Sequence, residues 1–296
     1  MEHKAIAAVK KHFADFDPKT FKLGDVDPND TLGLDENDVE EALKDKVAEL
    51  SDLQERLYAE KDWSLLVIFQ AADGGGKDSA IKHVLSGTNP SGINVWSFSH
   101  PTSEDLSHDF LWRANKRLPE RGKVAIFNRS YYEDVLAVRI FPDLLKEQHL
   151  PPKVITPNIW DERFEDINAF ETHLMRNGTK ICKFFLHVSL DEHKKRIMKR
   201  LTDPDKNWKF SPNDAKDRQH WSEFQNAVED MIKNTSPEEC PWKVVPANNK
   251  WVVHLAVATA MVDTLKELDL EFPQMDNKQL HQLRSLLATR ARLEDR

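Results

Sequence analysis

A glycine-rich turn at residues 73–77, with the sequence Asp-Gly-Gly-Gly-Lys, directly follows an apolar run that ends at residue 70. Three consecutive glycines, Gly74, Gly75 and Gly76, let several backbone N–H groups turn toward one anion, because no Cβ blocks the approach of phosphate oxygens. Lys77 and the start of the helix expected after it add positive charge at the same point. The pattern predicts a phosphate-binding loop; the alternative is an ordinary glycine-rich turn with a solvated lysine.

This loop departs from the usual pattern G-x-x-x-x-G-K-[ST] at two positions. Ala71 occupies the motif position of the first glycine, and Asp78 occupies the position of the serine or threonine whose hydroxyl group binds magnesium. Asp73 lies inside the loop, where a carboxylate next to phosphates is tolerable only with a cation between them. We therefore predict Asp73 as the ligand of Mg²⁺, with Mn²⁺ as an alternative, and Asp78 and Ser79 as phosphate or nucleotide contacts.

A second set of polar residues follows the apolar run at 124–127. In phosphate-loop enzymes the strand beside the loop strand ends in an acid that orients magnesium, and Asn128 occupies that tip here without bringing charge. Arg129 is placed to reach the same phosphates, although a salt bridge to an acid at 133 or 134 is the alternative. Tyr132 and Glu133 complete this predicted nucleotide-binding segment.

A basic stretch lies between residues 193 and 218, where nine lysines and arginines stand against four aspartates. Two prolines and an Asn-Trp step interrupt the helical pattern in its middle, as in the mobile helical lids that bring cations onto transferring phosphates and exclude water. We predict a lid over about residues 195–222. A structural helical hairpin, or a solvated helix face, is the alternative.

Strand and helix signals alternate along most of the chain, which predicts an α/β fold with a parallel sheet covered by helices on both faces. No linker or internal repeat divides it, so we expect one kinase-type domain over 36–270, an N-terminal arm on the surface over 1–35 and a tail over 271–296. The expected strands and helices lie at the following residues: strands at 93–98, 123–127, 181–188 and 242–245, helices at 35–62, 103–118 (capped at 102 or 103), from 190, and around 251–268.

Composition narrows the function further. The chain has 296 residues with a formal net charge of −8, which argues against a protein built to coat nucleic acid. It contains no run of 18 apolar residues and no apolar stretch of a secretion signal at its start, and its two cysteines suggest neither a disulfide framework nor a zinc site. We expect a cytoplasmic protein without membrane or nucleic-acid partners.

Three segments, in this order and spacing, resemble the polyphosphate kinase 2 family. They are Ala-Ala-Asp-Gly-Gly-Gly-Lys-Asp-Ser-Ala-Ile-Lys at 71–82, Phe-Asn-Arg-Ser-Tyr-Tyr-Glu-Asp-Val-Leu at 127–136, and Leu-Thr-Asp-Pro-Asp-Lys-Asn-Trp-Lys-Phe-Ser at 201–211. The resemblance runs from about residue 30 to 270. It implies a phosphate-loop kinase fold similar to thymidylate kinase, and transfer of phosphate between inorganic polyphosphate and nucleotides.

The resemblance also implies roles for particular residues. Asp73 matches the loop aspartate implicated in magnesium binding and in activating the acceptor phosphate, the three glycines and Lys77 match the phosphate cradle, and Arg129 matches an arginine that holds the transferring phosphate. Many family members carry aspartate where this chain has Asn128. The basic residues expected along a polyphosphate channel are Lys82, Arg139, Arg196, Lys206 and Arg218.

The segment at 128–133 is most similar to the family branch that acts on both nucleoside monophosphates and diphosphates. This implies AMP, ADP and ATP as nucleotides, with GMP and GDP left open, and a homo-oligomer (dimer or tetramer). Two other functions stay open: an ATP-dependent nucleoside monophosphate kinase of the same fold, and a regulatory protein that binds nucleotide without turnover. Neither base preference nor reaction direction follows from the spacing of these residues.

Overall fold

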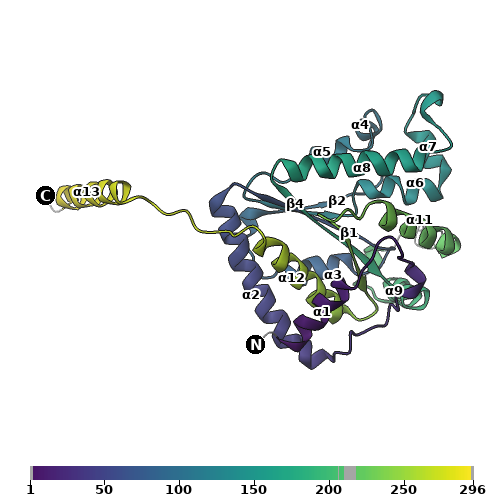
Figure 1. Cartoon of the computed structure of the whole chain (residues 1–296), viewed down its shortest axis with the longest axis horizontal. Helices are drawn as coiled ribbons and strands as arrows, with labels where there is room; N and C mark the ends of the chain where they lie inside the picture. The colour runs from purple at the N-terminus through teal and green to yellow at the C-terminus, as the bar shows by residue number, and fades with distance from the viewer. Residues whose placement is uncertain (1–2, 206, 210–217, 295–296) are drawn as a thin grey trace.

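A single parallel sheet forms the centre of the protein (Figure 1). The computed structural model describes residues 3–205, 207–209 and 218–294, and within them the strand order is β2-β3-β1-β4-β5. The strands are β1 (Ser64–Gln70), β2 (Ile93–Ser97), β3 (Val124–Asn128), β4 (Thr179–His187) and β5 (Trp242–Pro246). Since parallel neighbours require crossover connections, helical segments link the strands and cover the sheet.

Helices lie on both faces of the sheet, as the alternation of signals predicts (Figure 1). The α-helices are α1 (Lys4–Ala14), α2 (Glu36–Glu60), α3 (Lys77–Val84), α4 (Ser103–Leu106), α5 (Trp112–Asn115), α6 (Ala137–Ile140), α7 (Pro142–Glu147), α8 (Ile159–Arg176), α9 (Leu190–Thr202), α11 (Trp221–Asn234), α12 (Lys250–Lys266) and α13 (Asn277–Glu294). Short 3₁₀ turns are η1 (Leu23–Asp25), η2 (Pro90–Gly92), η3 (Tyr131–Asp134), η4 (Pro152–Val154), η5 (Asn207–Lys209) and η6 (Arg218–His220).

Successive residues of β1 point to opposite faces and join separate apolar cores. Leu65 and Val67 pack with the helices α1, α2, α3 and α12. Leu66 and Ile68 pack instead with α8 and α11. All seven residues of β1 are buried, so the strand that precedes the glycine turn is held rigidly from both sides.

One predicted helix and the predicted arm differ from the structure. The helix expected over 103–118 is two short helices, α4 and α5, because the Asp109 side chain accepts from the Leu111 N–H at 2.9 Å and turns the chain between them. The predicted cap at Thr102 is confirmed by a reciprocal capping box with Asp105. The N-terminal segment is not only a surface arm, since α1 buries Ala5 and Val9 completely.

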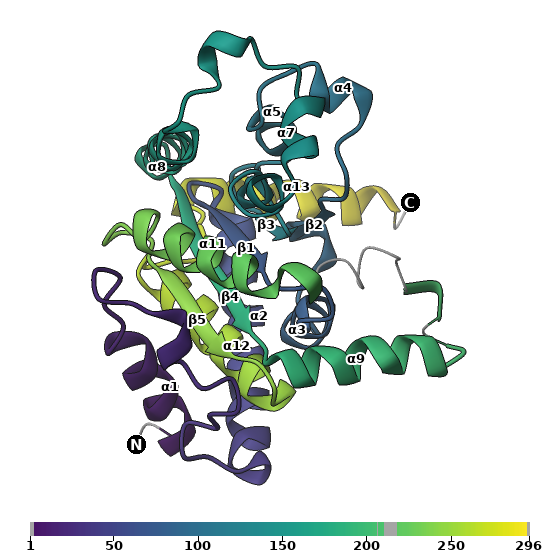
Figure 2. The same ribbon diagram turned by 90° about the vertical axis from the view of Figure 1, so that its right-hand side faces the viewer.

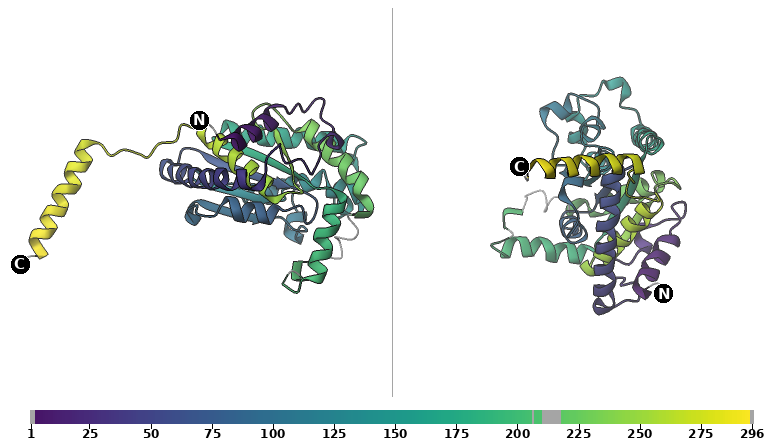
Figure 3. Two further views of the ribbon diagram at one scale, coloured as in Figure 1. Left: turned by 90° about the horizontal axis from the view of Figure 1, so that it is seen from below. Right: turned by 90° about the vertical axis from the view of Figure 1, so that its left-hand side faces the viewer.

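The tail predicted over 271–296 contains α13, which follows an extended stretch at 271–276 and projects away from the sheet (Figures 1 and 3). The exposed side chains of Leu280, Leu283 and Leu286 lie on this helix. Among the residues that the structure describes, no helix combines the length and apolar character needed to cross a membrane.

A buried ion pair lies under the sheet, where β4 meets α8. Lys183 and Glu171 are both fully buried, and the lysine Nζ donates to Glu171 Oε2 at 2.5 Å and to the backbone oxygen of Thr235 at 2.8 Å. The hydroxyl groups of Tyr131 and Tyr132 donate to the other carboxylate oxygen at 2.8 and 2.7 Å. Burial, together with the negative charge of Glu171, raises the pKa of both tyrosines well above the usual value.

We expect Lys183→Met to lower the free energy of unfolding by about 3–5 kcal/mol, because Glu171 would be left as an uncompensated buried charge. Urea denaturation followed by circular dichroism measures this. The control is Lys180→Met on the same strand, where the partly exposed pair with Glu267 at 2.9 Å is worth at most about 1 kcal/mol. If both variants lost the same free energy of unfolding, the stabilising role of the buried Lys183–Glu171 pair would be contradicted.

Candidate active site

The turn between β1 and α3 has the conformation of a phosphate-binding loop. Gly76 caps α3 with φ of 105°, in the left-handed region that other residues rarely adopt. A Cβ on Gly75 would lie 2.5 Å from Ala71 Cβ and 2.8 Å from the Ala72 backbone oxygen, so this position accepts only glycine. The two glycines hold the backbone close beneath the first turn of α3, where N–H groups bind anions.

Lys77 is buried at the base of this loop, 7% exposed. Its Nζ donates to the Ala71 backbone oxygen at 3.2 Å, which folds the side chain back over the turn. Burial, with repulsion from Arg129, lowers the pKa of Lys77 to about 8. The ammonium group is therefore charged at neutral pH and held where an anion would relieve its desolvation.

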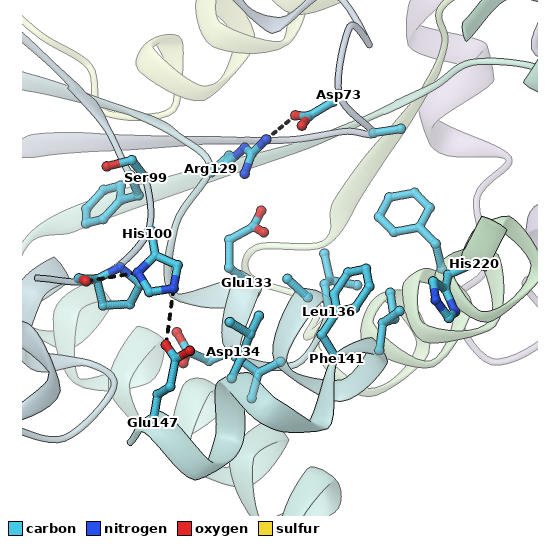
Figure 4. Close-up of a pocket in the computed structure, with 18 of the residues that line it drawn as sticks. Asp73, Ser99, His100, Arg129, Glu133, Asp134, Leu136, Phe141, Glu147 and His220 are labelled. Carbon is cyan, nitrogen blue, oxygen red and sulfur yellow. Dashed lines mark hydrogen bonds and ion pairs between the residues drawn. The ribbon is translucent and has the colours of Figure 1, made fainter. Parts of the chain in front are cut away.

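Asp73 and Arg129 form an ion pair across the mouth of the loop (Figure 4). Burial alone would raise the pKa of Asp73, but the charges of Arg129 and Lys77 outweigh it and hold the pKa below the usual value. Arg129 has a positive φ of 62°, a conformation that costs about 1–3 kcal/mol and is typical of functional positions. Among the described residues Arg129 forms its ion pair with Asp73, whereas the alternative from the sequence was an acid at 133 or 134.

Asn128 ends β3 beside the loop, and its amide Nδ2 donates to Asp78 Oδ1 at 2.9 Å. Glu133 is on the same side, and its Oε1 accepts from the Gln70 amide at 3.1 Å. Since β1 pairs with β3 so that Phe69 lies opposite Asn128, the tips of the two strands bring these side chains together. The strand register explains why residues some fifty positions apart share one site.

A cavity of about 690 Å³ opens from the loop on the β3 side (Figure 4). Its polar end is formed by Asp73, Asn128, Arg129 and Glu133. The opposite end is mainly apolar and includes Leu136 and aromatic side chains of the surrounding helices. Apolar and aromatic residues of the cavity lining include Phe98, Leu106, Leu136, Phe141, Leu144 and Phe224.

Asp134 and Arg113 also line the cavity. Asp134 is 3% exposed, and burial raises its pKa to about 6 against the opposing charges of Arg113 and Arg163. The Gln148 amide donates to Asp134 Oδ1 at 2.6 Å. Across the rim, His100 pairs with Glu147 at 3.2 Å (Figure 4). The wall of the cavity is thus held by polar contacts among several elements.

Two residues predicted as nucleotide contacts face away from this cavity. Ser79 points to α12, where its hydroxyl lies 3.1 Å from Nε2 of His254. Tyr132 is fully buried in the network around Glu171 and is not among the residues that line the cavity. The structure therefore brings together Asp73, the three glycines, Lys77, Asp78, Asn128, Arg129 and Glu133, but leaves Ser79 and Tyr132 in supporting positions.

Those predicted polyphosphate-binding residues whose side chains the structure describes lie at separate places. Lys82 is exposed on α3, whereas Arg139 donates to Asp230 at 2.7 Å between α6 and α11. Arg196 is turned toward the phosphate loop and donates to the Gly74 oxygen at 3.2 Å. Lys206 lies outside the described residues, and so does the side chain of Arg218 at the start of η6.

Sequence reasoning missed two arginines that line the cavity, Arg113 on α5 and Arg200 on α9. The positive charge of Arg200 helps to lower the pKa of Asp73. Its signal in the sequence was the four-residue spacing from Arg196, which places both on one face of a helix. Nothing in the sequence around Arg113 distinguishes it from other surface arginines.

Oxygen ligands for magnesium are available here. Among the described residues, no group of three or more histidine, cysteine or acidic side chains forms a ready-made metal cage. Magnesium typically binds through one or two carboxylates together with substrate phosphates, so a cage is not required. Asp73 fits that role, because it lies at the mouth of the loop and its pKa is below the usual value. Asp78 and Asn128 offer further oxygens nearby.

A parallel sheet, a glycine loop with a buried lysine after its central strand, and an arginine at the neighbouring strand tip define a kinase of the phosphate-loop class. The family described as Polyphosphate kinase 2 (PPK2) matches residues 33–273. The chain belongs to the polyphosphate kinase 2 family, and the resemblance inferred from its three sequence motifs is confirmed.

Individual relatives agree with this membership. An ADP-polyphosphate phosphotransferase of Rhodopseudomonas palustris is 45% identical over 251 residues, covering 83% of this chain and 87% of the relative. An AMP/ADP-polyphosphate phosphotransferase of Meiothermus ruber is 43% identical over 256 residues, covering 86% and 92%. The crystal structure of polyphosphate kinase 2 from Arthrobacter aurescens TC1 matches with a TM-score of 0.83 at 38% identity, covering 91% of this chain and 93% of that one.

We expect the kcat/KM of phosphoryl transfer to fall as pH rises through about 8, because Lys77 in the free enzyme loses its proton there. Lys77→Ala should lower the rate by about 10²–10³ and remove this decline from the residual activity. A pH–rate series at constant ionic strength measures both. Lys44→Ala, an exposed lysine on α2, is the control and should keep the wild-type profile.

Asp73→Asn should reduce the magnesium-dependent rate far more than Asn128→Ala. Asp73 is the charged group of the pair and also the partner of Arg129, whereas Asn128 can contribute only a neutral contact. Titrating magnesium against initial rate for both variants tests this. If both lose activity equally at every magnesium concentration, the metal has been assigned to the wrong residue.

Proposed function

We propose that this enzyme transfers the terminal phosphoryl group of inorganic polyphosphate to AMP and to ADP, giving ADP and ATP. The relatives named for ADP and for both AMP and ADP support these acceptors. The observation that carries the proposal is the position of Asp73, Arg129 and Lys77 at the polar end of a cavity of about 690 Å³, within the usual size range of sites for small ligands.

The acceptor nucleotide enters this cavity with its phosphate toward Arg129 and its base toward the apolar end. Aromatic rings such as Phe141 and Phe224 supply flat apolar surface for a base without a fixed pattern of hydrogen bonds. Arg113 and Arg200 provide further positive charge along the wall. A cavity of this kind holds the nucleoside loosely and the phosphates firmly.

Transfer requires the acceptor oxygen, the phosphorus atom and the leaving oxygen to lie nearly in line. An oxygen of the nucleotide phosphate forms the new P–O bond while the bond to the rest of polyphosphate breaks, which leaves a chain shorter by one phosphate. Lys77 and the loop N–H groups hold the donor side. Arg129, which is paired with Asp73 in the unliganded protein, then pairs with the charge on the transferring group. Because the arginine already lies beside the loop, the protein reorganises little during the reaction.

Magnesium would be held by Asp73 together with substrate phosphates, where it would neutralise charge on the phosphate oxygens. The low pKa of Asp73 keeps its carboxylate available at neutral pH. Homo-oligomerisation and a cytoplasmic location remain predictions from the family resemblance and the composition.

An ATP-dependent nucleoside monophosphate kinase is the alternative with the same fold. We expect AMP, long-chain polyphosphate and magnesium to give first ADP and then ATP, with no nucleoside triphosphate supplied and adenylate kinase absent. Time courses by ion-exchange chromatography follow all three nucleotides, and parallel courses with GMP test the base. Formation of ADP only when ATP is added would establish the alternative; ADP without ATP would limit the enzyme to the first step.

A further inference from the structure

Two adjacent tyrosines, Tyr131 and Tyr132, follow Arg129 closely in the sequence but do not line the cavity. Their hydroxyl groups donate to the same oxygen, Oε1 of Glu171, at 2.8 and 2.7 Å. Lys183 Nζ donates to the other oxygen of this carboxylate, and also to the Tyr132 hydroxyl at 3.2 Å. All four of these side chains, the two tyrosines with Glu171 and Lys183, are fully buried, and we call them the anchor.

The anchor is part of the framework of the domain. Glu171 belongs to α8 and Lys183 to β4, and the lysine also donates to the backbone oxygen of Thr235, directly after α11, at 2.8 Å. The helices α8 and α11 contribute to the same apolar core beside β4 (Figure 2). Burial keeps the pKa of both tyrosines well above the usual value, so their hydroxyl groups remain protonated and act as donors. The turn that carries the tyrosines is therefore fixed to the framework.

Arg129 has a backbone conformation that is unfavourable for a residue with a Cβ. Its φ of 62° lies in the left-handed region, and such a conformation persists only where surrounding contacts fix it. The Arg129 N–H donates to the Phe69 oxygen of β1 at 3.0 Å. On the other side the turn closes at once, since the Tyr132 N–H donates to Ser130 Oγ at 3.2 Å. The strained residue is thus held between β1 and the turn that carries the two tyrosines.

The ion pair with Asp73 does not hold Arg129 during transfer. In the proposed reaction the guanidinium leaves Asp73 and pairs with the charge on the transferring group. Its position then depends on the backbone from Arg129 to Tyr132 rather than on the carboxylate. Positioning at this moment matters, because a displacement of about 1 Å can cost about 10²-fold in rate.

From this arrangement, and resting on the proposed function, we infer that the two tyrosine hydroxyl groups, held by Glu171, position Arg129 for phosphoryl transfer. They act through the backbone: the anchor fixes the turn, and the turn keeps Arg129 at a positive φ with its guanidinium beside the phosphate loop. When the hydroxyl groups are removed, the turn is free to relax toward a negative φ at Arg129. The guanidinium then moves away from the transferring phosphorus.

Tyr131→Phe and Tyr132→Phe test this inference, because each keeps the buried ring and removes one hydrogen bond. We expect each to lower kcat for AMP phosphorylation about tenfold at saturating polyphosphate and magnesium, part of the loss that a displacement of about 1 Å can cause. Tyr58→Phe on α2 is the matched control and should keep the wild-type kcat. Each rate is measured at a temperature at which circular dichroism shows the variant to be fully folded.

A second control separates positioning from a general loss of stability. Val257→Ala on α12 removes volume from the apolar core on the opposite face of the sheet, where the residue is fully buried. It should lower the midpoint of urea denaturation and leave kcat of the folded protein unchanged. A tenfold fall of kcat in this variant too would overturn the inference, because destabilisation anywhere would then produce the effect.

A double-mutant cycle with Arg129 gives the decisive measurement. Arg129→Ala should lower kcat by about 10²–10³, and it leaves no guanidinium to position. In that background Tyr131→Phe should change the residual kcat less than twofold. A tenfold loss in both backgrounds, or an unchanged kcat when Tyr131→Phe is made in the wild type, would overturn the inference. If Tyr131→Phe does not fold, the same cycle with Tyr132→Phe decides.

Transfer from polyphosphate to AMP by the wild-type protein is measured in the same assay. Its absence would refute the proposed function. Its presence together with additive losses in the cycle would refute only the positioning role of the anchor.

Discussion

The contact between Asp73 and Arg129 is the interaction on which the site depends. Two cations, Lys77 and Arg129, stand close together in a partly desolvated place, and the charge of Arg129 adds to the larger effect of burial in lowering the pKa of Lys77. The carboxylate of Asp73 offsets part of the repulsion between them. The two positive charges in turn lower the pKa of Asp73 and keep it ionised. In the unliganded protein Asp73 therefore stabilises the two cations. When phosphates bind, their negative charge takes over this role.

The fold places these groups by register rather than by proximity in sequence. β1 and β3 pair in parallel, so their carboxyl ends bring the glycine loop and Arg129 to one edge. β1 is packed on both faces, and the Lys183–Glu171 pair fixes β4 against α8. A rigid sheet thus carries a loop whose conformation depends on glycines and an arginine with a positive φ.

Local signals predicted the strands and the phosphate loop because their causes are local: an apolar run, then residues whose backbone conformation only glycine permits. The orientation of Ser79 and Tyr132 could not be predicted, since the side to which a residue points depends on packing that the sequence pattern does not show. The same limit hid Arg200, whose role comes from the position of α9 beside the loop. The helix α1 was missed because the role of its apolar residues becomes evident only where they pack against α12.

The two sides of the phosphate loop are unequal, and this inequality bears on how one site can serve two acceptors. The β3 side has a cavity with an apolar end, suited to a nucleoside. On the side toward β4 and β5, Arg196 donates to the backbone oxygens of Ala247 and Asn248. A donor without a nucleoside has no fixed end and can advance along the loop by one phosphate, whereas a nucleoside on the donor would anchor it at a single register. On the proposed function, an acceptor that is one phosphate longer would be accommodated by a shift of the donor, while Lys77 and Arg129 stay in place.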